Sequence, residues 1–433
     1  MKIHWVNHAS FIFESENVRL LTDPWLFGTA FNDGWELLAD SVIEESYLKT
    51  ITHIWFSHEH PDHFHVPSVK YLSKICNERT KILYQETRDK RVINFCKAQG
   101  FLTQEVKPFV NTSLSEETSI KVGTVPFYDS WLCINNKNKN ILNLNDCVLK
   151  KKKQLQSIQS HLGNVDILMP QFAYANWVGN PEDVLLQKEA ADDKLDRLKL
   201  AVEVFEPFFT IPHASYCRFS HKENIYLNEQ NNSIDKVYDT LKKQGITNTI
   251  ILKPGDSWDC NKILDPDPAI SFYMSKRSSF NSKNDLSPSI SLEELISSSK
   301  EYVEKINKKN NKFFLTFLRL TGLMPKIYFY IEDLKKAIVF NHRLEIEILD
   351  EEYNPELHVK LSSDSLNFLL KNEFGFDTLM VNGRFRSSSK NNKKMFRAFA
   401  IASLNNMGYS LNWKIFLQMS FFKRVFEKLL MSS

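Results

Sequence analysis

The sequence predicts an α/β fold for residues 1 to about 260, and three observations indicate it. The chain opens with strand-like alternation in KIHWVNH, SFIFES and VRLLTDPW. A later run, ITHIWFSH, is rich in β-branched and aromatic residues and ends at a group of histidines. Beyond it, strands and amphipathic helices alternate in a mixed order, as in DDKLDRLKLAVEVFEPF followed by FTIPHAS.

The histidine group lies between a strand and a helix. ITHIWFSH, residues 51–58, has the composition of a buried strand, and VPSVKYLSKIC after it has apolar residues at helical spacing. Pro67 suits the first turn of that helix, because its missing N–H has no partner there in any case. The stretch SHEHPDHF is therefore predicted to be a strand-to-helix loop.

The chain divides into two parts around a polar stretch. SKRSSFNSKNDLSPSIS is rich in Ser, Asn and Lys and poor in large apolar residues, which is typical of a linker. We expect a domain over 1–265, a linker over 266–292 and an α+β accessory domain over 293–433.

Composition favours a cytoplasmic protein and gives no sign of nucleic-acid binding. The 55 basic and 52 acidic residues leave a net charge of only +3, so no overall field marks a nucleic-acid binder. The six cysteines form no CxxC pair, which favours a reducing compartment. No signal peptide is recognisable, and no apolar run reaches the roughly 18 residues that a transmembrane helix needs.

The loop HEHPDH carries the residue types of a metal centre. His58 and His60 lie two residues apart, so both imidazoles can reach one ion, and Asp62 and His63 can turn toward a neighbouring position. Neutral imidazole and carboxylate suit zinc, and also iron or manganese. The alternative is a solvent-exposed histidine cluster without a metal.

His58, His60, Asp62 and His63 match the HxHxDH motif of the metallo-β-lactamase superfamily. NHAS with His8 and LLTDPW with Asp23 resemble the opening strands of its lactonase and phospholipase D branches. The resemblance implies an αββα sandwich. It also implies a carboxylate between two metal positions, and Asp146 in NLND resembles that bridging residue. The alternative for Asp146 is an ordinary strand end.

The remaining ligands depart from the family pattern. Residues 66–145 contain no histidine, so the usual third histidine is not evident, and Asp129 in FYDSWL is a substitute from an adjoining strand or a plain turn residue. The last family histidine has two candidates, His213 in IPHASY and His221 in RFSHKEN. We favour His221, acting with Asp62 in catalysis, over its reading as a surface loop residue.

Several segments resemble the metallo-β-lactamase portion of CMP-N-acetylneuraminate hydroxylases, over roughly residues 1–260: DPWLFGTAFNDGW, ILNLNDC, LKLAVEVFEPFFTIPHASYCRFSHKEN and LKPGDSWD. Those hydroxylases also carry a Rieske domain, which needs two Cys and two His in paired short spacings. This sequence contains no such set. We therefore expect a hydrolase with one or two Zn²⁺. An iron-dependent hydroxylase served by a separate Rieske partner, and a non-catalytic binding module, are the alternatives.

Substrate residues are predicted in two loops. FAYANWVGNP, residues 172–181, offers Tyr174, Asn176 and Trp177 to a sugar or nucleobase, as loops beyond strand ends often do. In LKPGD, Lys253 suits a phosphate and Asp256 a metal-bound water. The alternatives are a packed surface loop and a plain turn. The predicted substrate is phosphorylated, nucleotide-linked or sugar-derived, which points to carbohydrate metabolism.

The C-terminal part offers two further interpretations. Residues 358–386 resemble the sterol-carrier-like module of some metallo-β-lactamase-fold sulfatases, which implies an apolar pocket or a homodimer contact; a generic α+β domain is the alternative. WKIFLQMSFFKRVFEKLL has apolar residues at helical spacing among lysines, which suits a membrane surface or docking on its own domain. The runs at 150–153 and 387–394 are interpreted as solvated basic faces.

Overall fold

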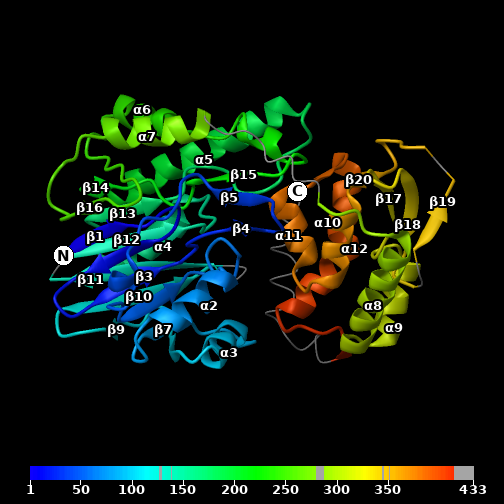
Figure 1. Cartoon of the computed structure of the whole chain (residues 1–433), viewed down its shortest axis with the longest axis horizontal. Helices are drawn as coiled ribbons and strands as arrows, with labels where there is room; N and C mark the ends of the chain where they lie inside the picture. Colours follow the sequence, from blue (N-terminus) through cyan, green and yellow to red (C-terminus); the bar gives the residue numbers. More distant parts are fainter. Residues whose placement is uncertain (126–128, 138, 279–286, 344–345, 351, 414–433) are drawn as a thin grey trace.

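The computed structural model describes residues 1–125, 129–137, 139–278, 287–343, 346–350 and 352–413 (Figure 1). Two large sheets face each other in the N-terminal domain. In spatial order, the first sheet holds β16 (Ser257–Trp258), β1 (Lys2–Trp5), β2 (Phe11–Glu14), β3 (Arg19–Thr22), β6 (His53–Phe56), β7 (Lys81–Gln85) and β8 (Leu102–Val106). The second holds β14 (Phe209–Thr210), β13 (Ile167–Pro170), β12 (Lys139–Asn145), β11 (Ser130–Asn136), β10 (Thr118–Thr124) and β9 (Thr112–Ser113).

Helices cover the outer face of each sheet. The described helices of this domain are α1 (Glu45–Leu48), α2 (Val66–Ile75), α3 (Arg91–Ala98), α4 (Lys152–Leu162), α5 (Val184–Phe205), α6 (Ile234–Lys243) and α7 (Asp267–Ser278), with a short 3-10 helix η2 (Ile225–Asn228). A small sheet of β15 (Cys217–Phe219), β5 (Trp35–Leu37) and β4 (Thr29–Ala30) lies at the side toward the C-terminal module (Figure 1). The predicted αββα sandwich is confirmed.

Alternating side chains build the layers, because successive residues of a strand point to opposite faces. In β6, Trp55 enters the core between the two sheets, whereas Ile54 and Phe56 pack with α2 and α3. In β11, Leu132 enters the same central core and Trp131 packs with α4 and α5. The loop after β6 is thereby held at the end of a strand that is buried on both faces.

The C-terminal module has a separate core around one five-stranded sheet. Its strands are, in spatial order, β19 (Glu347–Leu349), β18 (Lys336–Phe340), β17 (Ile327–Ile331), β20 (Val359–Leu361) and β21 (Phe385–Arg386). Its helices are α8 (Leu292–Lys309), α9 (Lys312–Leu320), α10 (Ser363–Lys371), α11 (Gly375–Asn382) and α12 (Ser389–Asn406). The strongly apolar terminal stretch from Lys414 lies outside the described residues.

The expected linker, 266–292, begins with a helix of the N-terminal domain. Helix α7 places Ala269 and Tyr273 in the central core. The hydroxyl of Tyr273 donates to the carbonyl of Leu252 at 2.9 Å and accepts from the indole N–H of Trp5 at 3.2 Å. Composition misses this helix because its few buried residues are surrounded by serine and charged residues.

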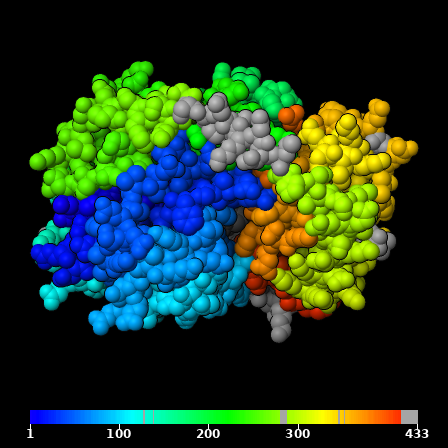
Figure 2. Space-filling view, in the orientation of Figure 1, coloured from blue at the N-terminus to red at the C-terminus, as the bar shows by residue number. Residues whose placement is uncertain are grey.

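The module packs closely on the N-terminal domain through α11 and β21 (Figure 2). Arg384, whose side chain is fully buried, donates to the carbonyl of Asn32 at 2.7 Å and to Glu223 at 2.7 Å. The ring of Trp177 stacks on that of Phe385, with centroids 4.8 Å apart. The contact between the two units is therefore both apolar and charged. Among the described residues, no helix is long and apolar enough to cross a membrane.

Candidate metal centre

The HxHxDH loop brings its side chains together immediately after β6. His58 Nε2 lies 2.8 Å from His60 Nδ1, and the rings of His58 and His63 are 4.3 Å apart between centroids. His58, Asp62 and His63 are buried, and His60 is half-buried against the ring of Phe31. Three of the four predicted ligands are thus enclosed, while His60 lies at the edge of the group.

Two residues outside the motif fix the rings of the histidines. Asp23, which directly follows β3, lies with its Oδ2 2.9 Å from His63 Nδ1, and its Oδ1 accepts from the backbone N–H of Ser57 at 2.7 Å. The hydroxyl of Ser57 contacts Nδ1 of both His58 and His63, at 2.9 and 3.2 Å. Because each Nδ1 is occupied in this way, each Nε2 faces the other candidate ligands, which are His60 for His58 and the two carboxylates of Asp62 and Asp146 for His63.

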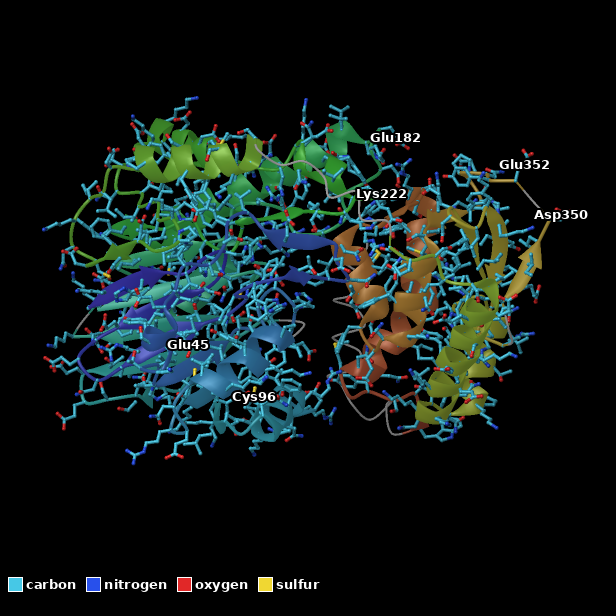
Figure 3. All side chains as sticks on the ribbon, in the orientation of Figure 1. Glu45, Cys96, Glu182, Lys222, Asp350 and Glu352 are labelled. Atoms are coloured by element: carbon cyan, nitrogen blue, oxygen red, sulfur yellow. The ribbon has the colours of Figure 1, made fainter. Side chains whose placement is uncertain are left out.

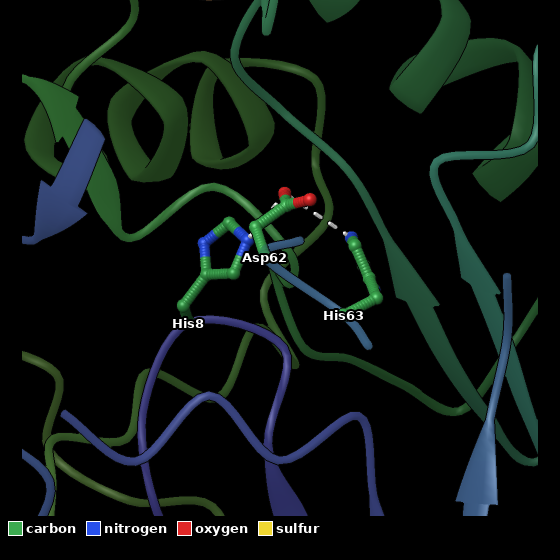
Figure 4. Close-up of side chains that lie close together, drawn as sticks. All are labelled: His8, Asp62 and His63. Atoms are coloured by element: carbon green, nitrogen blue, oxygen red, sulfur yellow. Dashed lines mark ion pairs between the residues drawn. The ribbon is translucent and has the colours of Figure 1, made fainter. Parts of the chain in front are cut away.

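His8 approaches Asp62 from the turn between β1 and β2 (Figure 4). Its Nε2 lies 3.5 Å from Asp62 Oδ2, and His63 Nε2 lies 3.4 Å from the same oxygen. Both ring nitrogens of His8, His63 Nε2 and Asp62 Oδ1 are buried without a hydrogen-bond partner. Buried polar atoms normally have partners, so this group has the character of a ligand set.

A second set of polar residues lies at the carboxyl ends of three neighbouring parallel strands. β12, β13 and β14 run parallel, and their carboxyl ends are followed by Asp146, Gln171 and His213. Asp146 Oδ2 lies 3.6 Å from His63 Nε2, and Gln171 Nε2 donates to Asp146 Oδ1 at 2.7 Å. The buried ring of His213 has both nitrogens without a partner. Residues far apart in sequence thus meet at one sheet edge, where α/β folds place their sites.

A lysine lies behind this second set. Lys194 of α5 donates its ammonium to Gln171 Oε1, and Gln171 in turn donates to Asp146. Burial lowers the pKa of Lys194 to about 8, although Asp146 opposes the shift. Lys194 and Gln171 therefore form a chain of hydrogen bonds that fixes one carboxylate oxygen of Asp146 and directs the other toward His63.

Asp129, which precedes β11, lies at the other side of His58. Its Oδ1 is 3.9 Å from His58 Nε2, in keeping with its expected place near the centre. Burial raises the pKa of Asp129 well above its usual range, and the neighbouring Asp146 adds to the increase. Asp129 therefore adds a third carboxyl group to the side chains around His58 and His63.

The electrostatics of the centre favour a bound cation. Burial alone would raise the pKa of Asp62, but His63 and His8 lower it well below its usual value. Burial alone would lower the pKa of His63, but Asp62, Asp146 and Asp23 raise it well above its usual value. Several carboxylates are thus enclosed around one histidine, which is an arrangement that a metal ion neutralises directly.

The donor chemistry fits a metal ion. Among the residues that the structure describes, two groups of side chains have ligand atoms all within 4.8 Å of one another: His8, Asp62 and His63, and His58, His63 and Asp146. Burial lowers the pKa of His58 and His213 well below the usual value, so both rings are neutral, as metal ligands must be. Nitrogen and carboxylate oxygen donors of this kind suit zinc, iron or manganese alike.

His221, our favoured last histidine, lies elsewhere in the structure. It follows β15 and contacts Glu223 at 3.2 Å and Ser287 at 3.3 Å. Figure 3 places the next residue, Lys222, at the border with the C-terminal module. His213 lies with the centre instead, because it follows β14, whose parallel neighbours also end there, whereas β15 belongs to the small sheet.

The predicted substrate residues make structural contacts. Tyr174 is buried and donates its hydroxyl to the carbonyl of Leu227, and Asn176 donates to the carbonyl of Trp177 at 2.8 Å. Trp177 itself belongs to the contact with the module. In the second loop, Lys253 Nζ pairs with Asp256 Oδ1 at 2.8 Å, which closes their own turn. A role for any of them in substrate binding stays a prediction.

The sequence predicted no role at the centre for Ser57, Gln171 or Lys194. His8 and Asp23 served only to identify the opening strands by their resemblance to the family. A single His or Asp at a strand end carries little signal by itself. The available signal was topological, since Gln171 lies near the end of the predicted strand VDILMPQF. Lys194 lies inside an amphipathic helix among other charged residues, where nothing distinguishes it.

Comparison with known proteins supports this description. Residues 2–182 match the model of the Beta-lactamase superfamily domain. Together with the sandwich and its histidine–aspartate centre, this match supports a metallo-β-lactamase-superfamily domain in the N-terminal part of the chain.

Its curated relatives include cytidine monophosphate-N-acetylneuraminic acid hydroxylases. The protein of Danio rerio is 26% identical over 58% of this chain and 44% of its own length. That of Mus musculus is 28% identical over 61% of this chain and 48% of its own length. The chain thus spans about half the length of these relatives. The solved isothiocyanate hydrolase from Delia radicum gut bacteria covers 59% of this chain and 98% of its own, at 12% identity and a TM-score of 0.44, which is too weak to bear on function.

Proposed function

We propose that this protein is a metal-dependent hydrolase of a phosphorylated, nucleotide-linked or sugar-derived small molecule. The observation that carries the proposal is the enclosed donor set around His58, Asp62, His63 and Asp146, with its buried atoms that lack partners. We expect these residues, with His60, to hold one or two ions, zinc foremost. A bound zinc-type ion lowers the pKa of water to about 7 and polarises a carbonyl or phosphoryl oxygen.

The side chains around the donor set have separate tasks in this proposal. Asp62 Oδ1, which has no protein partner, is placed to accept a proton from water and so to orient it. Asp23 and Ser57 hold the imidazoles, and Gln171 holds Asp146. His213 supplies the late histidine in place of His221. The substrate class is inferred from the sugar-nucleotide relatives and from the predicted loops.

The test is turnover of a panel of sugar nucleotides, sugar phosphates, phosphodiesters and lactones by protein of known metal content. We expect a substrate whose turnover falls at least about a thousandfold in His60→Ala and Asp62→Ala, as for loss of a group that acts at the reacting atoms. His161→Ala, which changes an exposed histidine, is the matched control and should keep full activity. Turnover that survives both centre variants would contradict the proposal, and absence of any turnover would favour a binding module.

A second candidate is an iron-dependent hydroxylase that receives electrons from a separate Rieske-type protein. The specific observation in its favour is the identity with CMP-N-acetylneuraminic acid hydroxylases over about three fifths of this chain. The same nitrogen and oxygen donors suit iron. Metal analysis with oxygen-uptake measurements on CMP-sugars separates the two candidates. Bound zinc and hydrolysis without oxygen uptake support the first, whereas bound iron and oxygen uptake with an added electron donor support the second.

A further inference from the structure

Helix α9 of the C-terminal module exposes an apolar face. Phe313, Phe317 and Leu320 are spaced at i, i+4 and i+7, so they lie on one side of the helix. Their exposed fractions are 64%, 53% and 72%. Leu315, between them in sequence, is fully buried in the module core. The helix is therefore apolar both inward and outward, and the outward side chains stay more than half exposed.

Two further residues extend this face. The ring of Trp413 stacks on Phe313, with centroids 6.0 Å apart, and meets Phe314 edge-on at 4.7 Å, while its own exposed fraction is 65%. Leu323, three residues after Leu320, is half-exposed at 51%. We call Phe313, Phe317, Leu320, Leu323 and Trp413 the apolar patch. Exposed apolar residues scattered singly are ordinary, but five gathered around one helix mark an interaction surface.

The sequence around α9 carries charge of one sign, although Lys309 pairs in space with Glu373 at 3.6 Å. From Lys305 to Ile331 the sequence contains no acidic residue and six cations, whereas basic and acidic residues are nearly balanced over the whole chain. The six cations are Lys305, Lys308, Lys309, Lys312, Arg319 and Lys326. All are exposed except Arg319, which is half-buried. A partner of the patch therefore needs an apolar region that contacts the aromatic and leucine side chains, and negative charge beside it that pairs with the cations.

We propose that α9 and its apolar patch dock on a membrane surface that contains anionic lipids. A short helix with aromatic and leucine side chains on one face and lysines beside it lies in the plane of a bilayer interface. A tryptophan at the edge of the patch suits the headgroup level, where indole is enriched. Anionic headgroups attract the flanking lysines, and this attraction weakens as salt rises.

The placement of α9 leaves the centre clear. In Figure 1, α9 lies at the outer side of the module, away from the sandwich that holds the HxHxDH loop. The patch also precedes residues 414–433, whose sequence repeats the combination of Phe, Leu and Ile with lysine and arginine and a single acidic residue. Docking through α9 would hold the N-terminal domain beside the membrane.

The experiment is co-sedimentation of the full chain with vesicles of phosphatidylcholine alone and with about one third phosphatidylglycerol added. We expect binding to the mixed vesicles that falls with added salt. The double variant Phe317→Ser/Leu320→Ser should bind at least about tenfold more weakly, and Lys308→Glu/Lys312→Glu should lose the preference for anionic lipid. Both should keep the thermal stability of the unmodified protein, because the changed side chains are exposed.

The matched control is Leu185→Ser/Leu186→Ser, which removes two exposed leucines from α5, in the N-terminal domain. It should bind vesicles like the unmodified protein. Binding that the α9 variant leaves unchanged, or that deletion of 414–433 alone abolishes, would overturn the proposal and assign binding to that segment. A dimer in light scattering that becomes a monomer in the α9 variant would also overturn it, because the patch would then be a contact between copies.

Discussion

Gln171 shows how a residue outside the candidate ligand set fixes the position of one candidate ligand, Asp146. Its Oε1 accepts a hydrogen bond from the ammonium of Lys194, and its amide N–H donates one to Asp146 Oδ1. The amide is thereby oriented from both ends, and Asp146 keeps one oxygen for the space beside His63. Outer residues of this kind orient the ligand and tune the site.

We predict that Gln171→Leu and Lys194→Met each weaken metal binding by about 10- to 100-fold, the range usual for loss of an outer-shell partner. Calorimetric titration of metal-free protein with Zn²⁺ measures this, and the visible spectrum of the Co²⁺-loaded protein reports the changed ligand field. Lys188→Met, on an exposed part of the same helix, is the control. If all three variants bind Zn²⁺ as tightly as the unmodified protein, this chain of hydrogen bonds does not support the centre.

Residue-scale prediction succeeded where the signal is local. His58, His60, Asp62 and His63 lie within six positions after one buried strand, so their proximity follows from chain connectivity. The structure places His213 beside the centre and the favoured His221 away from it, although only eight residues of sequence separate the two positions. Strand order decides such a choice, and a single sequence does not give strand order across sheets.

At the scale of elements, the turn before β5 is held by the C-terminal module. Phe31, Asn32 and Asp33 all have positive φ, between 54° and 56°, a conformation that is costly for residues with side chains. Asn382 donates to the carbonyl of Phe31 at 3.0 Å and Arg384 to that of Asn32 at 2.7 Å. This turn also places the ring of Phe31 against that of His60. The C-terminal module therefore supports, through the turn, a side chain that contacts the centre.

We predict that Arg384→Met lowers the free energy of unfolding by about 3–5 kcal/mol, because it leaves Glu223 and Asp364 at the contact without their cation. Arg384→Lys should recover only part of this loss, since one ammonium cannot replace the fork of donors. Urea unfolding followed by tryptophan fluorescence measures both. Arg386→Met, two residues on and exposed, should change stability by less than about 0.5 kcal/mol; a similar loss there would contradict the assignment.

Elements with strong periodicity were predictable, and the contact between the two units was not. The strand before the HxHxDH loop and the helix that starts near Pro67 were found as predicted. Tyr174 and Trp177 were interpreted as ligand contacts because exposed aromatics in a loop suit sugars. In the structure they pack on Leu227 and Phe385. Aromatic rings serve both purposes, so the sequence of one loop does not distinguish a binding site from an interdomain contact.

At the scale of the whole molecule, metal removal should lower the stability of the entire protein and not only that of the loop with the candidate ligands. Asp62 and Asp146 are enclosed together, and without a cation their repulsion is opposed mainly by His63. We predict that chelation lowers the midpoint of thermal unfolding by several degrees, and that excess Zn²⁺ restores it, since a ligand at about 1,000 times its Kd contributes roughly 4 kcal/mol. Scanning calorimetry of loaded and chelated protein measures this.

The Asp62→Ala/Asp146→Ala variant is the control for that experiment. It lacks both carboxylates, so its midpoint should respond little to either chelator or metal. If the unmodified protein behaves in the same way, the centre holds no metal that matters for stability.

The left-handed turn at Phe31–Asp33 also has a consequence for the order of events during synthesis. Its carbonyl partners are Asn382 and Arg384, which leave the ribosome some 350 positions later than the turn itself. The nascent N-terminal domain can therefore build both sheets while the wall beside His60 is still without its supports. We expect the centre to reach its final form only after Asn382 and Arg384 have been made, although all of the predicted ligands precede them in the sequence.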